Sequence, residues 1–408
     1  MLGGREKVLE SAENEEKPIL VHVAAAEKEK FPYEVLFRSV MKHLMDSATN
    51  EFVFTRDFFA TNARDAFNNI FTRTLSLVLE NLENFLFTCH DAIALLLMIR
   101  LTHTHRRIMK ARRVNVLDNF LDRVNMLLWP RLKFLFDNNL KALRNAVTKK
   151  LGTIDTTPHY VSRRYAEFAA AILTLTKGLE AAAVAPVSAA AGAGGGVGKQ
   201  QQPDLFSPVK SGGEEMLRAD MSALHQEVVK LLHGMASTHT VAKSRTVFLL
   251  NNYDQIICIF NERKVSNEEL AKFEDKLMQQ RELFVEEELA GSYAKMIAFV
   301  KQTEAQLKAT ASGGELNIDT ALVESLVKQF SGNWKQGIET INKNVLSYFS
   351  NFKNGTEILK QCLTQLLLYY TRLQDIIKQA WRKPPPFVKD IVSTSAILAE
   401  IKKYALAI

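Results

Sequence analysis

The sequence predicts an all-α protein made of elongated rods of long helices packed as helical bundles. Apolar residues recur every three or four positions over long stretches, which is the period of an amphipathic helix. No stretch alternates apolar and polar residues for long enough to predict a strand. Breaker clusters such as Ser312-Gly313-Gly314 and Pro384-Pro385-Pro386 separate the helical stretches.

Composition indicates a folded, mildly basic protein. The 408 residues, 47% hydrophobic and 24% charged, are enough for two or three domains with a sizeable core. A formal net charge of +7 over this length is equally compatible with nucleic acid, an acidic partner or a membrane surface. The three cysteines, Cys89, Cys258 and Cys362, lie far apart in helical contexts, so we expect free thiols in a reducing compartment.

No segment has the features of a membrane span or a secretion signal. The longest clean apolar run, Ala92 to Ile99, is far shorter than the roughly 20 residues that a membrane span needs. This run is apolar nearly all round and is predicted to be a buried core helix within a helical stretch from Asp65 to Arg113. Residues 1–17 are charged and lack an apolar signal core. We therefore expect a soluble protein that attaches to membranes through partners.

Composition divides the chain into four expected segments. Residues 1–30 are rich in Glu, Lys and Ala without a sustained apolar stripe and predict a loose leader. A first helical bundle is expected over 31–185. Residues 186–213 contain mainly Ala, Gly, Ser, Gln and Pro and predict a disordered insertion. A C-terminal helical bundle is expected over 214–408.

The strongest helical pattern runs from Ile338 to Ala380. In a heptad that starts at Ile338, every a position is apolar and only Gly355 interrupts the d positions. The phase predicts one continuous helix of about 65 Å, at about 1.5 Å per residue. Additional apolar e positions widen the face and favour packing with the chain's own helices over a coiled coil with another chain. Gly355 is interpreted as a notch that a neighbouring helix approaches closely.

The sequence shows no catalytic arrangement. No nucleophile, base and orienting group occur together and no metal-ligand spacing is present, so we expect no enzyme, no cofactor and no metal site. An α-helical enzyme whose site is assembled only in space is the alternative. Gly192 to Lys199 is similar to a phosphate-binding loop, but Gln200 replaces the required Ser or Thr and no strand precedes it, which favours a flexible linker.

A basic segment covers residues 100–113. It contains two histidines, His103 and His105, which lie on different faces of a regular helix and cannot chelate one metal. A solvated helix end, favoured by the helix dipole, is the preferred interpretation. An anionic partner or a phosphoinositide surface is the alternative. A helical scaffold or nucleic-acid-binding protein that uses this segment is the rival function.

Five stretches carry a resemblance to a known family. They are Phe31–Arg38 with its Phe-Pro-Tyr-Glu start, Leu127–Arg131, Asp155–Phe168, Val247–Asp254 and Phe349–Thr356. Together, and in this order, they resemble the vacuolar protein sorting-associated protein 52 family from about Phe31 to the end, apart from the insertion.

The resemblance implies a subunit of a tethering complex of helical rods. The family supplies a subunit of the Golgi-associated retrograde protein (GARP) complex and of its endosomal recycling sister (EARP). The implied role is to capture endosome-derived vesicles at the trans-Golgi network, in retrograde transport and recycling. The implied partners are the other GARP and EARP subunits, a Golgi Rab GTPase and SNAREs, with no nucleic acid. The implied location is the cytoplasm and the cytosolic face of trans-Golgi network and endosome membranes.

Family members usually carry an N-terminal coiled-coil half used for assembly, and this chain is expected to begin after it. The matching motifs also supply the candidate partner-binding residues, which are Asp155, His159, Tyr160, Arg163, Arg164, Tyr165, Asn351, Phe352, Asn354, Gly355 and Thr356. For the residues from Asp155 to Tyr165, a helix cap with a packed aromatic pair is favoured over partner contact. For the residues from Asn351 to Thr356, a tight helix contact is favoured over partner contact.

Overall fold

A computed structural model describes residues 2–13, 19, 30–59, 62–146, 151–184, 212–309, 318–381 and 384–406. Within these ranges every regular element is a helix and there is no strand, which confirms the predicted all-α class. Residues 186–211 of the expected disordered insertion lie outside the described ranges. Its last two residues, 212 and 213, already belong to a helix.

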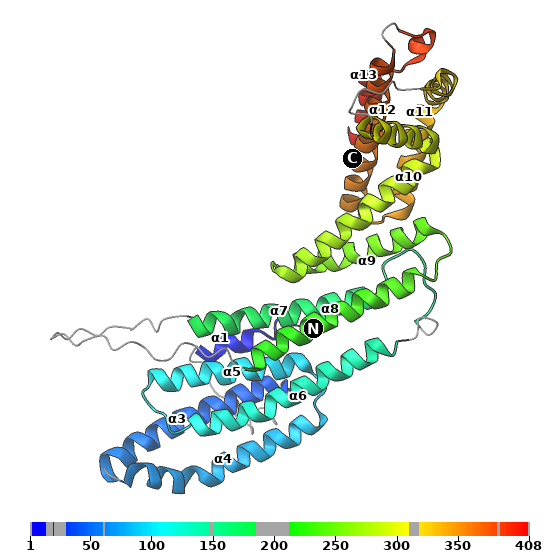
Figure 1. Cartoon of the computed structure of the whole chain (residues 1–408). Coiled ribbons are helices and arrows are strands. Elements are labelled where there is room, and N and C mark those ends of the chain that lie inside the picture. Colours follow the sequence, from blue (N-terminus) through cyan, green and yellow to red (C-terminus); the bar gives the residue numbers. More distant parts are fainter. Residues whose placement is uncertain are drawn as a thin grey trace, which may run out of the picture. The chain divides into compact units, whose positions relative to one another are not determined.

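The chain divides into two compact units (Figure 1). The first comprises Met1–Val147, Arg164–Leu231 and Arg263–Val265, and the second comprises Thr148–Arg163, Leu232–Glu262 and Ser266–Ile408. This division differs from an expected second bundle that starts at residue 214. The helix after the insertion packs on the first unit instead, because ion pairs join it to that unit's helices, such as Lys133 to Asp220 at 2.6 Å and Arg144 to Glu227 at 2.8 Å.

The first unit is a bundle of long helices. Its elements are α1 (Lys7–Glu13), α3 (Tyr33–Phe59), α4 (Ala63–Thr88), α5 (Ala92–Ala111), α6 (Asp118–Arg144) and most of α7 (Tyr160–Val184) and α8 (Gly212–Ala236). Helix α5 packs against α1, α3 and α6. Every residue from Ala92 to Ile99 is buried, as predicted for a core helix. The apolar run therefore forms the centre of this unit.

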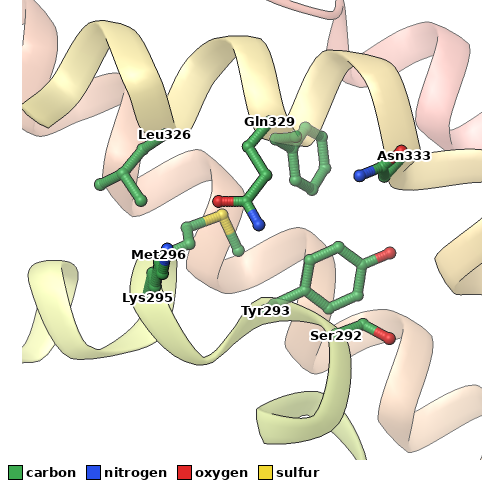
Figure 2. Close-up of a pocket in the computed structure, with 8 residues that line it drawn as sticks. Ser292, Tyr293, Lys295, Met296, Leu326, Gln329 and Asn333 are labelled. Atoms are coloured by element: carbon green, nitrogen blue, oxygen red, sulfur yellow. The ribbon is translucent and has the colours of Figure 1, made fainter.

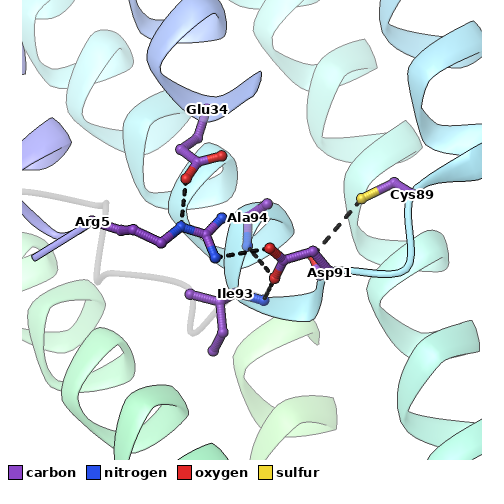
Figure 3. Close-up of polar contacts among 6 residues, drawn as sticks. All are labelled: Arg5, Glu34, Cys89, Asp91, Ile93 and Ala94. Atoms are coloured by element: carbon purple, nitrogen blue, oxygen red, sulfur yellow. Dashed lines mark hydrogen bonds and ion pairs between the residues drawn. The ribbon is translucent and has the colours of Figure 1, made fainter. Parts of the chain in front are cut away.

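The helical stretch predicted from Asp65 to Arg113 is interrupted before α5. The Asp91 carboxylate caps α5 by accepting hydrogen bonds from the amides of Ile93 (2.9 Å) and Ala94 (3.1 Å) (Figure 3). An Asp at the N-cap satisfies amide groups that the helix itself leaves unpaired. Helix α4 has already ended at Thr88, so the chain turns between the two helices.

Part of the expected loose leader is ordered. The Arg5 guanidinium donates to Glu34 at 2.6 Å and to Asp91 at 2.8 Å, which ties the N-terminal segment to the starts of α3 and α5 (Figure 3). The Glu34 side chain is almost fully buried, and Val8 of α1 is buried as well. A buried carboxylate needs such a partner, because an unpaired one would carry a large desolvation cost.

The second unit contains the remaining helices. They are α9 (Ala242–Glu262), α10 (Glu268–Ala309), α11 (Thr320–Tyr348), α12 (Phe352–Ala380), the short 3₁₀ helix η3 (Pro386–Asp390) and α13 (Thr394–Leu406). Helix α10 packs against α9, α11 and α12, and α12 also contacts α13.

The predicted continuous helix from Ile338 to Ala380 is wrong. Helix α11 ends at Tyr348, the backbone of Phe349 is extended, and α12 starts at Phe352. The break precedes Gly355 because Asn351 caps α12 through the Lys353 amide, at 3.2 Å. The heptad stripe is otherwise buried on both helices, from Ile338 to Ile377, except at the half-buried Tyr348 and the exposed Phe352. A break this short leaves the apolar period nearly unchanged, so the pattern did not reveal it.

Helix α10 bends at Tyr293, where α11 passes. The backbone of Tyr293 is non-helical (φ −127°, ψ 18°), and its hydroxyl donates to the Trp334 carbonyl at 3.2 Å. A Cβ atom on Gly337 would overlap this buried phenol. Beside Tyr293 lies a cavity of about 30 Å³ (Figure 2). That volume suits ordered water and is far below the roughly 300 Å³ of a small-molecule site.

The contact between Tyr293 and Gly337 predicts that alanine substitutions at two glycines of α11 change the free energy of unfolding in opposite directions. Gly337→Ala should lower the free energy of unfolding by about 1–3 kcal/mol, because the added methyl group displaces a buried, hydrogen-bonded ring. Gly332→Ala is the matched control, since its Cβ would meet no described atom within 4 Å. The control should raise stability by up to about 1 kcal/mol through helix propensity. Urea unfolding curves measure both changes, and equal stabilisation by the two variants would show that the phenol does not fill this space.

The basic segment at residues 100–113 is less solvated than predicted. His105 is fully buried, and its two ring nitrogens have no hydrogen-bond partner in the described part of the chain. Burial, with a smaller contribution from the Arg38 charge, lowers the pKa of His105 to about 4. Arg106 pairs with Asp122, and Arg112 with Asp46. The segment therefore belongs partly to the core of the first unit.

This buried histidine predicts loss of stability in acid. The unfolded imidazole binds a proton below its ordinary pKa of about 6.5, whereas the folded one stays neutral down to about 4. Stability is therefore fully present above pH 6.5 and falls by about 3 kcal/mol as the pH drops through this window. Unfolding curves at several pH values should show that His105→Met removes this part of the slope. The exposed His43→Gln should leave it unchanged, and an unaltered slope in His105→Met would contradict the assignment.

Candidate partner-binding site

Three of the motif segments meet in the second unit. They are the loop and first turn of α7 over residues 151–163, the Val247–Asp254 stretch of α9, and the connection between α11 and α12 at residues 349–356. Helix α9 is central, because polar side chains on it bond to both of the other segments. We refer to this arrangement as the α9 junction.

Asn252 joins α9 to the start of α7. Its side-chain oxygen accepts a hydrogen bond from the His159 amide at 2.8 Å and another from the Ser162 hydroxyl at 2.7 Å. Its side-chain nitrogen donates to the Phe248 carbonyl at 2.7 Å. The residue is fully buried, so these bonds replace the water contacts that it loses on folding. The Asn252 amide thus fixes where α7 begins.

Asn251 joins the other two segments. Its side-chain nitrogen donates to the Thr156 carbonyl at 2.8 Å and to the Tyr348 carbonyl at 2.9 Å. These acceptors lie more than 90 residues away, in opposite directions along the sequence. One side chain therefore connects the loop before α7 to the end of α11.

Asp254 completes the junction one turn further along α9. Its carboxylate accepts from the Asn351 side chain at 2.6 Å, and that same residue caps α12. Burial raises the pKa of Asp254, and the Asn351 hydrogen bond and the Arg281 charge oppose this rise. Arg281 of α10 also donates to the side-chain oxygen of the buried Asn354 at 3.0 Å. The break between α11 and α12 is thereby held by α9 and α10.

Five of the eleven predicted partner-binding residues face inward. His159, Asn354 and Tyr165 are buried, Gly355 is buried beneath the end of α11, and Asn351 is half-buried on Asp254. Tyr165 and the exposed Arg164 lie in the part of α7 that belongs to the first unit. The structure therefore does not gather the whole predicted set on one surface.

The remaining predicted residues lie outward. Tyr160 is 49% exposed and Phe352 is 59% exposed, although both are aromatic. Arg163 is exposed on the first turn of α7, and Thr356 is half-buried and donates to the carbonyl of Phe352. Exposed aromatic side chains next to a rigid, hydrogen-bonded frame are suited to contact with another protein.

Two of the predicted residues have local structural roles. The Asp155 carboxylate accepts from the hydroxyl and amide of Thr157, and these bonds hold its pKa below the usual range. The proposed notch at Gly355 is not confirmed, because a Cβ there would meet Phe349 at 3.6 Å and Val345 at 3.9 Å. These are ordinary contacts with the preceding helix end. No neighbouring helix approaches the position closely among the described residues.

Sequence reasoning missed the α9 amides as functional residues. Asn251 and Asn252 stand between Leu250 and Tyr253 in an otherwise apolar helix, and that position was a usable signal. Polar side chains inside an apolar run are normally satisfied by specific partners. Apart from the Phe248 carbonyl, their partners lie 90 or more residues away and could not be read from the local pattern.

An exposed aromatic cluster in the first unit was also missed. It consists of the exposed residues Phe54, Phe58 and Phe59 at the end of α3. The Phe58 ring lies 5.7 Å from the Phe54 ring and 5.0 Å from the Phe59 ring, measured between centroids. The α3 pattern did not reveal it, because apolar residues near a helix end are usually buried.

Two kinds of feature are absent from the described residues. None of the helices there has a stretch long and apolar enough to cross a membrane. No group of three or more His, Cys, Asp or Glu side chains in those same ranges could hold a metal ion.

Comparison with known proteins finds similarity to one family. The chain matches the family model described as "Vps52, C-terminal" over residues 1–190. It is 38% identical over 406 residues to vacuolar protein sorting-associated protein 52 A of Arabidopsis thaliana, and 30% identical over 407 residues to vacuolar protein sorting-associated protein 52 homolog of Homo sapiens. The chain is therefore similar to members of the Vps52 family over nearly its whole length. Each alignment covers 99% of the chain and 52% of the relative, so the chain spans about half the length of these curated relatives.

A solved structure shows a related fold. A chain from the study "The structures of exocyst subunit Exo70p and the Exo84p C-terminal domains reveal a common motif" superposes with a TM-score of 0.51. The match covers 98% of this chain and 85% of that chain at 10% sequence identity. At this identity the likeness concerns the fold alone. The protein thus shares its helical architecture with a chain from an exocyst study.

The α9 junction predicts a large cost for losing one amide. Asn252→Ala removes three hydrogen bonds and leaves the His159 amide and the Ser162 hydroxyl buried without this acceptor, so it should lower stability by at least about 2 kcal/mol. The exposed Asn333→Ala in α11 is the control and should change stability by less than about 0.5 kcal/mol. Urea unfolding measures both variants. Equal, small effects would show that the Asn252 bonds do not hold the unit together.

Proposed function

We propose that this protein is a Vps52-type, non-enzymatic subunit of a vesicle-tethering complex. Its place of action is retrograde transport from endosomes to the trans-Golgi network, with a further role in endosomal recycling. Similarity to Vps52 proteins over nearly the whole chain is the observation that carries the proposal. The all-helical fold and its likeness to a chain from an exocyst study are compatible with a tether, whose task is mechanical.

The mechanism that we propose is geometric. Long helices act as stiff spacers, and α12 with its 29 residues is about 44 Å long at about 1.5 Å per residue. A spacer is useful only if its helices are fixed at their ends. The α9 junction supplies such a fixed point, because two segments that are distant in the sequence both bond to one helix there. No bond is made or broken in this mechanism, and no cofactor takes part.

The proposed partners are the other subunits of the GARP and EARP complexes, a Golgi Rab GTPase and SNAREs. Association with membranes would then be peripheral and indirect, at the cytosolic face of the trans-Golgi network and endosomes. Tyr160 and Phe352 are the exposed aromatic residues at the α9 junction that we assign to partner contact. Arg163, which is exposed about one turn after Tyr160 on α7, supplies a charged group that can set the orientation of a partner.

The rival function, nucleic-acid binding by residues 100–113, is less well supported. Phosphate binding needs exposed cations. Arg106 and Arg112 instead pair with carboxylates of the first unit, and His105 is buried. From the sequence alone, these charged side chains could have bound phosphate. In the structure they pair with carboxylates, so we do not propose nucleic acid as the ligand.

Affinity purification of the tagged chain from cells tests the proposal. The other GARP or EARP subunits should co-purify with it, and Tyr160→Asp together with Phe352→Asp should lower their recovery several-fold. A charged residue disfavours a desolvated aromatic contact. Met278→Asp is the matched control, because Met278 is also an exposed apolar residue of the second unit.

Recovery of none of these subunits with the unmodified chain would contradict the proposed function. Equal recovery with the aromatic variant and with the control would leave the function in place but contradict the assigned surface.

A further inference from the structure

A pocket lies where α12 ends and the chain enters η3. It has a volume of about 390 Å³ and lies within the second unit. Its apolar walls come from Ile377, Trp381, Pro384, Pro385, Val388 and Ile391. A volume of 300–1,000 Å³ is typical of sites that enclose a ligand group. This pocket is therefore large enough to receive a bulky apolar side chain.

The walls of the pocket are held in place by contacts outside it. Trp381 meets the buried ring of Phe387 edge to face, with centroids 5.8 Å apart. The Tyr370 hydroxyl and the Gln374 amide both donate to the Val392 carbonyl, at 2.9 and 3.2 Å. These bonds fix the backbone beside Ile391 against α12. A pocket that exists before binding costs less conformational entropy on association.

Among the described residues, the one charged residue that lines the pocket is basic. It is Lys378, whose side chain is 75% exposed. Its contact with the exposed Asp375 is long, at 3.5 Å, and a surface pair of this kind contributes little. In the sequence, residues 375–390 contain four basic residues and two acidic ones. This local excess of positive charge favours a ligand that carries negative charge.

We propose that this pocket binds an acidic segment of a partner protein, which inserts one bulky aromatic or aliphatic side chain between Trp381 and Ile391. The segment's carboxylates then lie near Lys378. Tryptophan in a preformed pocket is a frequent centre of binding energy in protein interfaces.

A protein segment fits the pocket better than an anionic membrane does. Membrane-binding aromatic residues project from the surface so that they can enter the lipid interface. Here the apolar residues line a hollow, and Trp381 is partly covered and packed on Phe387. Binding at this pocket does not rest on the proposed tethering role, and it can be tested with the purified chain alone.

Selection of displayed random 12-residue peptides on the purified chain tests the proposal. The enriched peptides should be acidic and should contain one or two bulky apolar residues. One of them, synthesised with a fluorescent label, is then titrated with the chain and followed by fluorescence anisotropy. Trp381→Ala should weaken its binding at least tenfold, because the pocket loses a main wall.

Charge variants at exposed positions leave the core intact, so they test binding separately from folding. Lys378→Glu, at an exposed site, should weaken binding several-fold at low salt, and the effect should shrink as salt is added. Lys343→Glu is the control, since Lys343 is equally exposed on α11 but does not line the pocket, and it should bind like the unmodified chain. Circular dichroism confirms that each variant is folded.

Three results would overturn the proposal. The first is that no acidic peptide is enriched, and the second is that the enriched peptides bind the Trp381→Ala and Lys378→Glu variants as tightly as the unmodified chain. The third is binding to vesicles of phosphatidylserine that is lost in Trp381→Ala, with no peptide binding. That last result would assign the pocket to a membrane surface.

Discussion

Two adjacent buried asparagines in α9 hold the second unit in its observed arrangement. Asn251 and Asn252 bond to the loop before α7, to the first turn of α7 and to the end of α11. A buried amide without partners would cost free energy, so each asparagine favours only arrangements in which its partners are present. Apolar packing supplies the driving force for folding, but it is tolerant of small shifts. The amides add the directional constraint that fixes how these segments meet.

The dependence on partners that are distant in the sequence explains which features could be predicted from the sequence. The all-α class follows from apolar periodicity, and the buried centre of α5 follows from a run that is apolar all round. Both are local properties of the chain. The break between α11 and α12 was missed, because it depends on Asn351 bonding to Asp254, 97 residues earlier, and leaves the heptad stripe almost in phase. The pairing of α8 with the first unit was missed for a similar reason, since it rests on contacts such as Lys133 to Asp220.

The motif residues divide into a frame and a surface. Within the frame, His159 and Asn354 are buried and bonded to α9 and α10, so their chemistry is used inside the unit. Tyr160 and Phe352 lie at the outer side of the same junction. A rigid frame that displays a few exposed aromatic residues suits a subunit whose role is to hold partners at defined positions. Under the proposed tethering role, which uses no reactive group, the position of these side chains is the functional property.

Hydrogen exchange of the Asn251→Ala variant, followed by mass spectrometry, tests this account most directly. Asn251 bonds to residues on both sides of the junction, so its loss should expose peptides from residues 151–163 and from 345–356 together. Peptides from the first unit, such as those of α5, should keep the protection of the unmodified chain. The account predicts this paired loss of protection at two distant segments. Loss confined to α9, with both other segments still protected, would contradict the view that the α9 amides hold the unit together.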